Sequence, residues 1–180
     1  MYHYEEIIDF WFEEIDPKCW WKKDSDFDQK IKDRFLEMHH AVINCELYSW
    51  RKDPFGRLSE IIVLDQFSRN IYRYDPRAFT YDSMALVLSQ EAIENSADEK
   101  LDPDQKSFLY MPFMHSESQK IHEVAATLFS QSEMESNYSF ELKHKAIIDH
   151  FGRYPHRNKI LGRQSTDEEI TFLKQPGSSF

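Results

Sequence analysis

The chain has 180 residues, of which 41% are apolar and 15% aromatic, so it carries too many core-forming residues for a disordered protein. Its length is that of one domain, and its 4 glycines argue against turn-rich all-β folds and against glycine-dependent phosphate loops. The 22 basic and 32 acidic residues give a formal net charge of -10, which argues against binding nucleic acid or an anionic membrane through the overall field.

The opening segment MYHYEEIIDFWF is acidic where a signal peptide would be basic. The longest uninterrupted apolar run covers residues 61–64, far fewer than the ~20 residues of a membrane helix. The two cysteines, Cys19 and Cys45, form no C-x-x-C pair. We therefore expect a soluble cytoplasmic protein in which both cysteines are small core residues.

Apolar residues recur at spacings of three and four along almost the whole chain, which predicts helices. In the first half we expect a short helix over Glu5–Phe12, a long helix from Asp24 or Ser25 to Cys45, and a third helix over about Arg57–Tyr72. The apolar positions of the third helix go nearly all round its surface. This pattern is typical of a buried central helix.

Capping signals place the helices of the second half. We expect one from Asp75 to about Asn95, one from Pro103 that stops or kinks at Pro112, one opened by the capping box Ser116–Gln119, one over Ser139–Phe151 with Gly152 at its C′ position, and a last one opened by the capping box Thr166–Glu169. No segment alternates as a strand would. The sequence predicts an all-α single domain of about seven or eight helices over residues 1–174, with a frayed tail at residues 175–180.

Polar residues interrupt the apolar faces of the expected central helix, and such placement is informative because charges are rarely buried without partners. Asp65 and Arg69 stand four residues apart on one face, and Gln66, Asn70 and Arg73 form an adjacent line. These five side chains are candidates for a binding site inside the fold.

The late helix and the segment after it add basic residues and histidines. His144 shares an apolar stripe and should point inward, and the following segment contributes Arg153, His156, Arg157, Asn158 and Arg163. Between residues 143 and 163, six basic residues are opposed by one aspartate, a local charge of +5. Guanidinium groups suit carboxylates and phosphates, so this segment is typical of an anion site.

His115 precedes Ser116 and Glu117, but adjacent residues cannot form a relay triad, and Ser116 is better explained as a helix N-cap. His115 and His144 remain the candidates for a general base. Two E-x-x-H pairs, at residues 37–40 and 141–144, are no more than chance predicts for this composition. We therefore predict neither a metal site nor a cofactor.

Three segments resemble a known bacterial family: LDQFSRNIYR at residues 64–73, PFMHSE at residues 112–117 and HFGRYPHRNKILGRQST at residues 150–166. They look like the signatures of domain of unknown function 924, and the resemblance covers nearly the whole chain. Ser68 and Tyr154 depart from the residues common in that family. The resemblance implies an all-α fold similar to tetratricopeptide (TPR) helical arrays and implies no catalytic residues.

The leading hypothesis is a pocket that binds a small anionic ligand or an acidic peptide end. Its lining would be Asp65, Gln66, Arg69, Asn70, Arg73, His115, His144, Arg153, His156, Arg157, Asn158 and Arg163.

Three alternatives stay open. One is a hydrolase or transferase on a phosphorylated or carboxylated metabolite, with His115 or His144 as base. Another is a TPR-like module that binds a protein partner. In the third, the arginines pair with Asp65, Glu117 and helix C-terminal carbonyls and serve only the fold.

Overall fold

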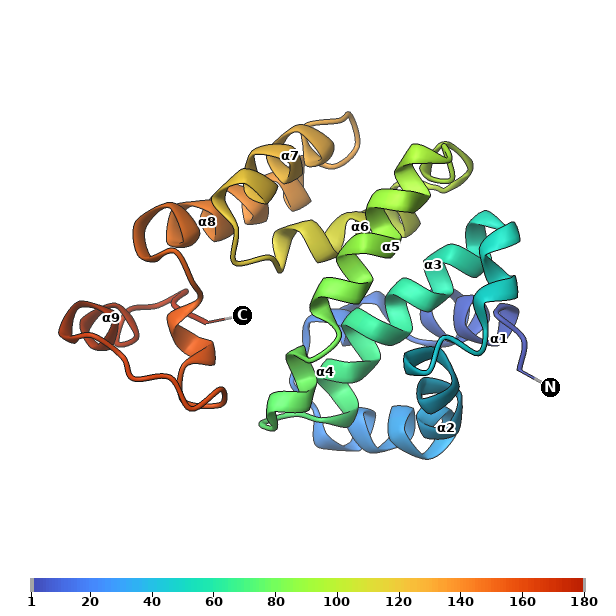
Figure 1. Cartoon of the computed structure of the whole chain (residues 1–180), viewed down its shortest axis with the longest axis horizontal. Helices are drawn as coiled ribbons and strands as arrows, with labels where there is room; N and C mark the ends of the chain where they lie inside the picture. Colours follow the sequence, from blue (N-terminus) through green and yellow to red (C-terminus); the bar gives the residue numbers. More distant parts are fainter. Residues whose placement is uncertain (1, 180) are drawn as a thin grey trace. The chain divides into compact units, whose positions relative to one another are not determined.

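The computed structural model describes residues 2–179, and these contain helices and turns but no strand, which confirms the all-α fold class (Figure 1). The chain folds as two compact units. Unit 1 comprises Met1–Arg73 and Arg77–Pro112, and unit 2 comprises Tyr74–Pro76 and Phe113–Phe180. The single domain and the TPR-like array stay predictions.

The first two thirds of the chain contain six α-helices joined by short turns. They are α1 (Glu5–Ile8), α2 (Ser25–Ile43), α3 (Pro54–Ile62), α4 (Ser68–Ile71), α5 (Asp82–Glu94) and α6 (Pro103–Met114), with 3₁₀ turns at Pro17–Trp21, Tyr48–Lys52, Pro76–Phe79 and Asp98–Lys100. Helix α2 begins as predicted, because the Asp24 carboxylate accepts hydrogen bonds from the amides of Asp26 at 3.0 Å and Phe27 at 3.2 Å.

The central helix is buried as predicted but is not a continuous α-helix. Helix α3 passes into a π-helical turn, Val63–Phe67, before α4 begins. A second π-helical turn, Asp9–Glu14, follows α1 where one short α-helix was expected. The two turns pack together, with the Phe67 ring centroid 6.1 Å from that of Phe10 and 5.5 Å from that of Trp11. The wider π turns place these aromatic rings in the core of unit 1.

Two boundaries in this part of the chain differ from the predictions. The helix expected from Asp75 begins only at Asp82, because Tyr74 adopts a left-handed conformation with φ 67° and a 3₁₀ turn follows at Pro76–Phe79. The expectation that both cysteines are core residues is also wrong. Cys45 is exposed, with φ 58°, and Cys19 is half-buried.

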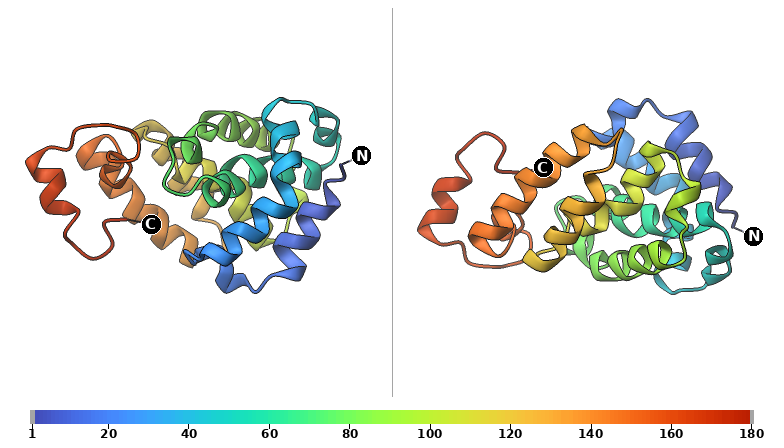
Figure 2. Two further views of the ribbon diagram at one scale, coloured as in Figure 1. Left: turned by 90° about the horizontal axis from the view of Figure 1, so that it is seen from below. Right: turned by 90° about the horizontal axis from the view of Figure 1, so that it is seen from above.

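Unit 2 is built on two helices, α7 (Gln119–Phe129) and α8 (Glu135–Phe151), which lie side by side (Figure 1, Figure 2). A 3₁₀ turn at Pro155–Arg157 and the short helix α9 (Asp167–Phe172) follow. Helix α8 starts four residues earlier than expected and ends at Gly152 with φ 69°, which confirms the predicted C′ glycine. The core of the unit is formed by Ile147, Ile148 and Tyr154, with Phe151 and Phe172 packed against it.

One of the two predicted capping boxes is present. At α9, the Thr166 hydroxyl accepts from the Glu169 amide and the Glu169 carboxylate accepts from the Thr166 amide. The box at Ser116–Gln119 is wrong, because α7 begins only at Gln119. The Gln119 side-chain amide instead donates to the carbonyl of Asp149 at 3.1 Å, and Ser116 offers its carbonyl to His122.

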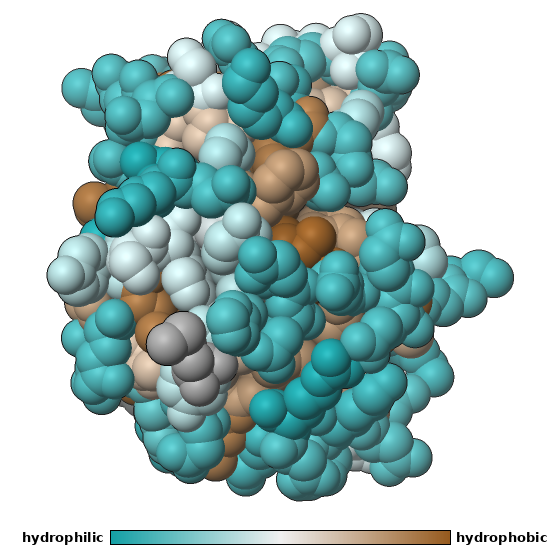
Figure 3. Space-filling model, turned by 90° about the vertical axis from the view of Figure 1, so that its right-hand side faces the viewer, coloured by the Kyte–Doolittle hydropathy of each residue, from teal (hydrophilic) through white to brown (hydrophobic). Residues whose placement is uncertain are grey.

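The surface of the described residues is largely hydrophilic on the face shown in Figure 3, where apolar residues form small separated patches. No helix within residues 2–179 is long and apolar enough to cross a membrane.

Near the C-terminus, Ser178 is buried and its hydroxyl donates to the carbonyl of Leu173 at 3.2 Å. Of the tail predicted at residues 175–180, Phe180 lies outside the described residues.

Gly56 gives a test of the packing in unit 1. A Cβ atom there would lie 2.2 Å from the carbonyl oxygen of Trp50, and a backbone atom cannot give way as a flexible side chain can. We expect Gly56→Ala to lower the free energy of unfolding by about 1–3 kcal/mol in urea denaturation, although alanine is the better helix former by about 1 kcal/mol. An unchanged or raised stability would contradict this close approach.

Candidate functional site

The polar residues predicted on the central helix are hydrogen bonded within unit 1. Asp65, in the π turn, is 1% exposed and receives Arg69 Nη1 at 3.1 Å on its carboxylate and at 2.6 Å on its carbonyl. The Arg69 guanidinium also forms two hydrogen bonds of 3.0 Å with the carboxylate of Asp82 on α5. Asp65 and Arg69 therefore share one face of the central helix, as predicted, and Arg69 joins this helix to α5 through Asp82.

The adjacent line of residues contacts α2 and α6. Asn70 Nδ2 donates to Asp28 Oδ1 at 2.8 Å, and the Arg73 guanidinium binds both oxygens of the same aspartate. Gln66 Nε2 donates to the Asp65 carboxylate and lies 3.2 Å from Met111 Sδ. Unit 1 thus uses these side chains to join its helices.

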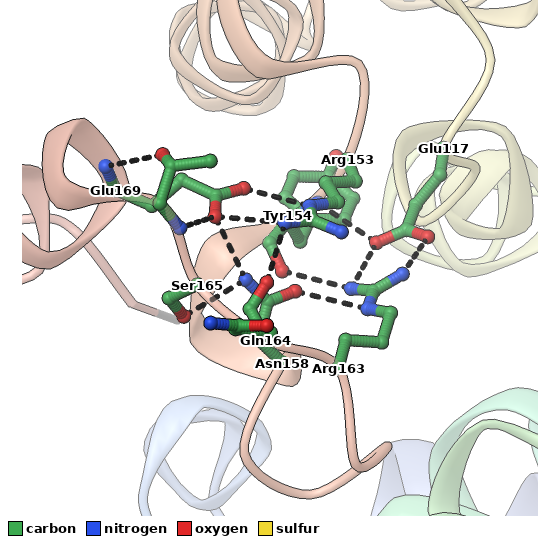
Figure 4. A network of polar contacts seen from close by, with 9 residues as sticks. Glu117, Arg153, Tyr154, Asn158, Arg163, Gln164, Ser165 and Glu169 are labelled. Carbon is green, nitrogen blue, oxygen red and sulfur yellow. Dashed lines mark hydrogen bonds and ion pairs between the residues drawn. The ribbon is translucent and has the colours of Figure 1, made fainter.

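Unit 2 contains a network of charged hydrogen bonds that starts at Arg153 (Figure 4). Its guanidinium binds the Glu169 carboxylate through two hydrogen bonds of 2.7 and 2.8 Å and donates to the Gln164 carbonyl at 2.9 Å. Glu169 is 2% exposed. This bidentate pair joins the end of α8 to the start of α9.

Arg163 forms the second bidentate pair of the network. Its guanidinium binds the two carboxylate oxygens of Glu117 at 2.6 and 2.9 Å and also donates to the carbonyl of Tyr154 at 3.1 Å and to Asn158 Oδ1 at 2.9 Å. Glu117 accepts a further hydrogen bond of 2.8 Å from the Tyr154 amide. The predicted pairing of an arginine with Glu117 is therefore present, whereas the carbonyl that Arg163 binds belongs to the segment after α8 and not to a helix C-terminus.

Asn158 connects the two pairs. It is fully buried, accepts from Arg163, and donates through Nδ2 to Ser165 Oγ at 3.0 Å and to Glu169 Oε2 at 3.2 Å. In Figure 4 its side chain lies between the two arginine–glutamate pairs. Arg153, Asn158 and Arg163 form one structural network that fixes the segment after α8.

The network shifts the acidity of its carboxylates. Hydrogen bonds from Arg153, supported by the Thr166 amide, lower the pKa of Glu169 to about 2. Burial raises the pKa of Glu117, but the hydrogen bonds from Arg163 and from the Tyr154 amide outweigh burial, so the net pKa lies below the ordinary value. Both groups are carboxylates at neutral pH.

A second group of predicted residues gathers on the ring of Tyr154, which is fully buried. The guanidinium carbon of Arg157 lies 4.6 Å from the ring centroid, and the imidazole centroids of His156 and His144 lie at 5.5 and 5.9 Å. We call Tyr154, His144, His156 and Arg157 the tyrosine cluster. It brings together three candidates that were only nearby in sequence.

His144 is 5% exposed, and its Nδ1 lies 2.8 Å from the Phe140 carbonyl. Burial lowers the pKa of His144 to about 3, and the positive charges of His115, His122 and His156 act in the same direction. His144 is therefore neutral at pH 7, with Nδ1 as the donor to Phe140. His115 and His156 therefore lie near enough to His144 to act on its pKa.

Sequence reasoning missed a buried pair next to this cluster. His122 and Glu141 are both fully buried, and His122 Nδ1 lies 2.7 Å from Glu141 Oε1. The signal was present, because His122 shares the buried face of α7 with Ala125 and Phe129. Glu141 belongs to one of the E-x-x-H pairs, but it binds His122 rather than a metal ligand set, and no group of three metal-ligating side chains occurs within residues 2–179.

The twelve predicted residues thus fall into two sets. Five belong to unit 1 and seven to unit 2, and each set is held by its own hydrogen bonds and ring contacts. A pocket that uses both sets stays a prediction.

Comparison with known proteins gives one family and one solved structure. The model of the family described as "Bacterial protein of unknown function (DUF924)" matches residues 7–177. The structure of a protein of unknown function, ATU0120 from Agrobacterium tumefaciens, is 34% identical in sequence and has a TM-score of 0.90, covering 95% of this chain and 96% of that chain. No curated protein matches the chain.

The Glu169 pair predicts an acid-dependent loss of stability. Because the folded-state pKa is about 2 and the ordinary value is 4.5, the pair stabilises the fold above pH 4.5 and loses this effect as the pH falls toward 2. We expect Glu169→Gln to be less stable than the wild type at pH 6 and to lose less stability between pH 4.5 and pH 2, as measured by urea denaturation.

The control is Glu168→Gln, which makes the same change at a neighbouring side chain that is 69% exposed. It should follow the wild-type pH profile. Parallel profiles for all three proteins would show that Glu169 does not carry this dependence.

Proposed function

Since the chain belongs to the bacterial DUF924 family, whose description states no activity, we propose its function from its own side chains: binding of a small phosphate- or carboxylate-bearing ligand at the tyrosine cluster of unit 2. One observation carries the proposal. Arg157, His144 and His156 converge within 6 Å of one buried tyrosine ring. Two imidazoles and one charged guanidinium, all of them nitrogen-bearing groups able to hydrogen bond, are thereby gathered around one ring.

The distribution of charge in unit 2 supports this location. Of the basic residues behind the local charge of +5, Lys145 pairs with Asp149, Arg153 with Glu169 and Arg163 with Glu117. Within each pair, the positive and the negative charge neutralise each other. The charge of Arg157 also acts on Glu117, whose pKa it lowers together with Arg163, and the buried carboxylate of Glu141 faces His122.

Arg157 has the properties expected of an anion anchor. It is 6% exposed, and its guanidinium carbon lies over the Tyr154 ring, 4.6 Å from the centroid, a cation–π contact that orients the group. A guanidinium held in this way suits the flat, two-oxygen edge of a carboxylate or phosphate. The local field, rather than the net charge of -10, would then decide whether an anion binds.

The enzyme alternative gains less support from the geometry. A general base works best when its pKa lies near the working pH, and the pKa of His144 is about 3. His144 is a weak base at pH 7, so it fits the role of a ligand-binding group better than that of a proton acceptor in catalysis.

We also propose a cytoplasmic location and a small-molecule partner rather than a nucleic acid. The exposed free thiol of Cys45 and the half-buried thiol of Cys19 are consistent with a reducing compartment. The acidic net charge opposes nonspecific binding to nucleic acid.

Thermal melting with inorganic phosphate tests the proposed site. At 100 times its Kd, a ligand stabilises the fold by about 2.7 kcal/mol, so we expect a rise in Tm of roughly 5–10 °C relative to sodium chloride of equal ionic strength. The rise should disappear in Arg157→Gln, which keeps a polar side chain but removes the charge.

The matched control is Lys159→Gln, which removes one positive charge from an exposed residue of the same segment. It should respond to phosphate as the wild type does. If neither phosphate nor a dicarboxylate such as succinate raises the wild-type Tm above the chloride control, the anion site does not exist.

The low pKa of His144 predicts that binding takes up protons. A bound anion favours the charged imidazole, so the pKa of His144 rises in the complex, and the Kd should increase as the pH is raised from about 3 toward that higher pKa. Calorimetric titration in two buffers of different ionisation enthalpy measures the uptake directly. The histidines His115, His122 and His156 face the same group, so His144→Asn identifies its share.

A further inference from the structure

The buried pair His122–Glu141 joins the two main helices of unit 2. Both side chains are fully buried, one on α7 and the other on α8, and their Nδ1 and Oε1 atoms are 2.7 Å apart. Two titratable groups rarely share a dry interior unless their protons are arranged to cancel charge.

The hydrogen-bond partners define where the protons lie. His122 Nε2 is 2.8 Å from the carbonyl oxygen of Ser116, and a carbonyl can only accept. Nε2 must therefore carry a proton. On the other side of the ring, Nδ1 faces Glu141 Oε1, and a contact of 2.7 Å between these atoms requires one proton between them.

The pair is neutral wherever that proton sits. It is either an imidazolium with a carboxylate or a neutral imidazole with a carboxylic acid. Burial raises the pKa of Glu141, while His122 and, more distantly, Lys145 act in the opposite direction and Asp149 reinforces burial. Glu141 Oε2 is buried and accepts no hydrogen bond from any described residue, a situation less costly for an acid carbonyl than for a carboxylate oxygen.

The pair reaches the tyrosine cluster through the Tyr154 hydroxyl. This hydroxyl donates to the Met114 carbonyl at 2.5 Å and lies 3.2 Å from His122 Nε2, whose proton it can accept. The hydroxyl end of Tyr154 is thus held by the Met114 carbonyl and contacts His122 Nε2, whose one proton is shared between this hydroxyl and the Ser116 carbonyl. On the same ring lie Arg157 and His156.

We propose that His122 and Glu141 are positioning residues of the anion site: they share one proton, keep the Nε2–H of His122 in place, and so fix the tyrosine on which the ligand-binding groups rest. The proposal depends on the proposed function for its ligand, but the shared proton can be measured without any ligand.

Nitrogen-15 NMR of the full chain tests the proton arrangement. We expect His122, assigned by its absence in His122→Gln, to carry a proton on Nε2 at neutral pH, because that atom donates to the Ser116 carbonyl, and a proton shared between Nδ1 and Glu141. An unprotonated Nε2, or no proton between Nδ1 and Glu141, would overturn the shared proton.

Two substitutions of Glu141 test the positioning role. In Glu141→Gln the amide can donate to Nδ1 and preserve the Nε2–H form, so phosphate should bind with a Kd within about threefold of the wild type. In Glu141→Leu the partner of Nδ1 is lost, and the Kd for phosphate should increase about tenfold. Removing the hydrogen-bond partner that orients a metal-binding histidine weakens metal binding by about 10- to 100-fold, and we expect the lower end of that range here. Glu123→Gln, an exposed change one residue from His122, is the control.

If Glu141→Leu does not fold, Tyr154→Phe takes its place, because it removes the hydroxyl that contacts His122 and keeps the ring. Equal phosphate affinity in the wild type, Tyr154→Phe and Glu141→Leu would overturn the positioning role. If the wild type does not respond to phosphate while His122 keeps its proton, the proposed function and the positioning role fail, and the shared proton stands.

Discussion

The backbone of Tyr154 is held on both sides, and the arrangement of unit 2 depends on this constraint. Its amide donates to Glu117, and its carbonyl accepts from Arg163, the arginine that also binds Glu117. One ion pair therefore closes a ring of hydrogen bonds around a single residue. Because the pair is bidentate and half-buried, it combines geometric precision with modest desolvation. The position of Tyr154 in turn determines where Arg157 and His156 can contact its ring.

This constraint separates two uses of positive charge in one segment. Arg153 and Arg163 form bidentate pairs with buried or half-buried glutamates and fix the chain, and Arg157 places its guanidinium over an aromatic ring. Residues of the same type, spaced by a few positions, thus do different work because their partners differ. The histidines extend this division, since His122 faces a carboxylate while His144 faces a backbone carbonyl.

The sequence was sufficient for the fold class and for helices with local signals. Asp24, Gly152 and the Thr166 box act within a few residues, so their roles are visible in the sequence. The π turn at Val63–Phe67 could not be predicted, because its hydrophobic pattern is equally compatible with an α-helix and the difference arises from packing against another segment. The site was predicted by residue type but not by pairing. His122 and Glu141 are 19 residues apart, and nothing local connects them.

The ion pair between Glu117 and Arg163 also has a consequence for the order of folding. It joins residues 46 positions apart, with both main helices of unit 2 between them. The two ends of this long loop come close together only after α7 and α8 have packed, which lowers the entropic cost of joining them. Contacts that form after the rate-limiting step influence how fast a protein unfolds far more than how fast it folds. The pair would then slow the unfolding of unit 2, while the packing of α7 against α8 would set its folding rate.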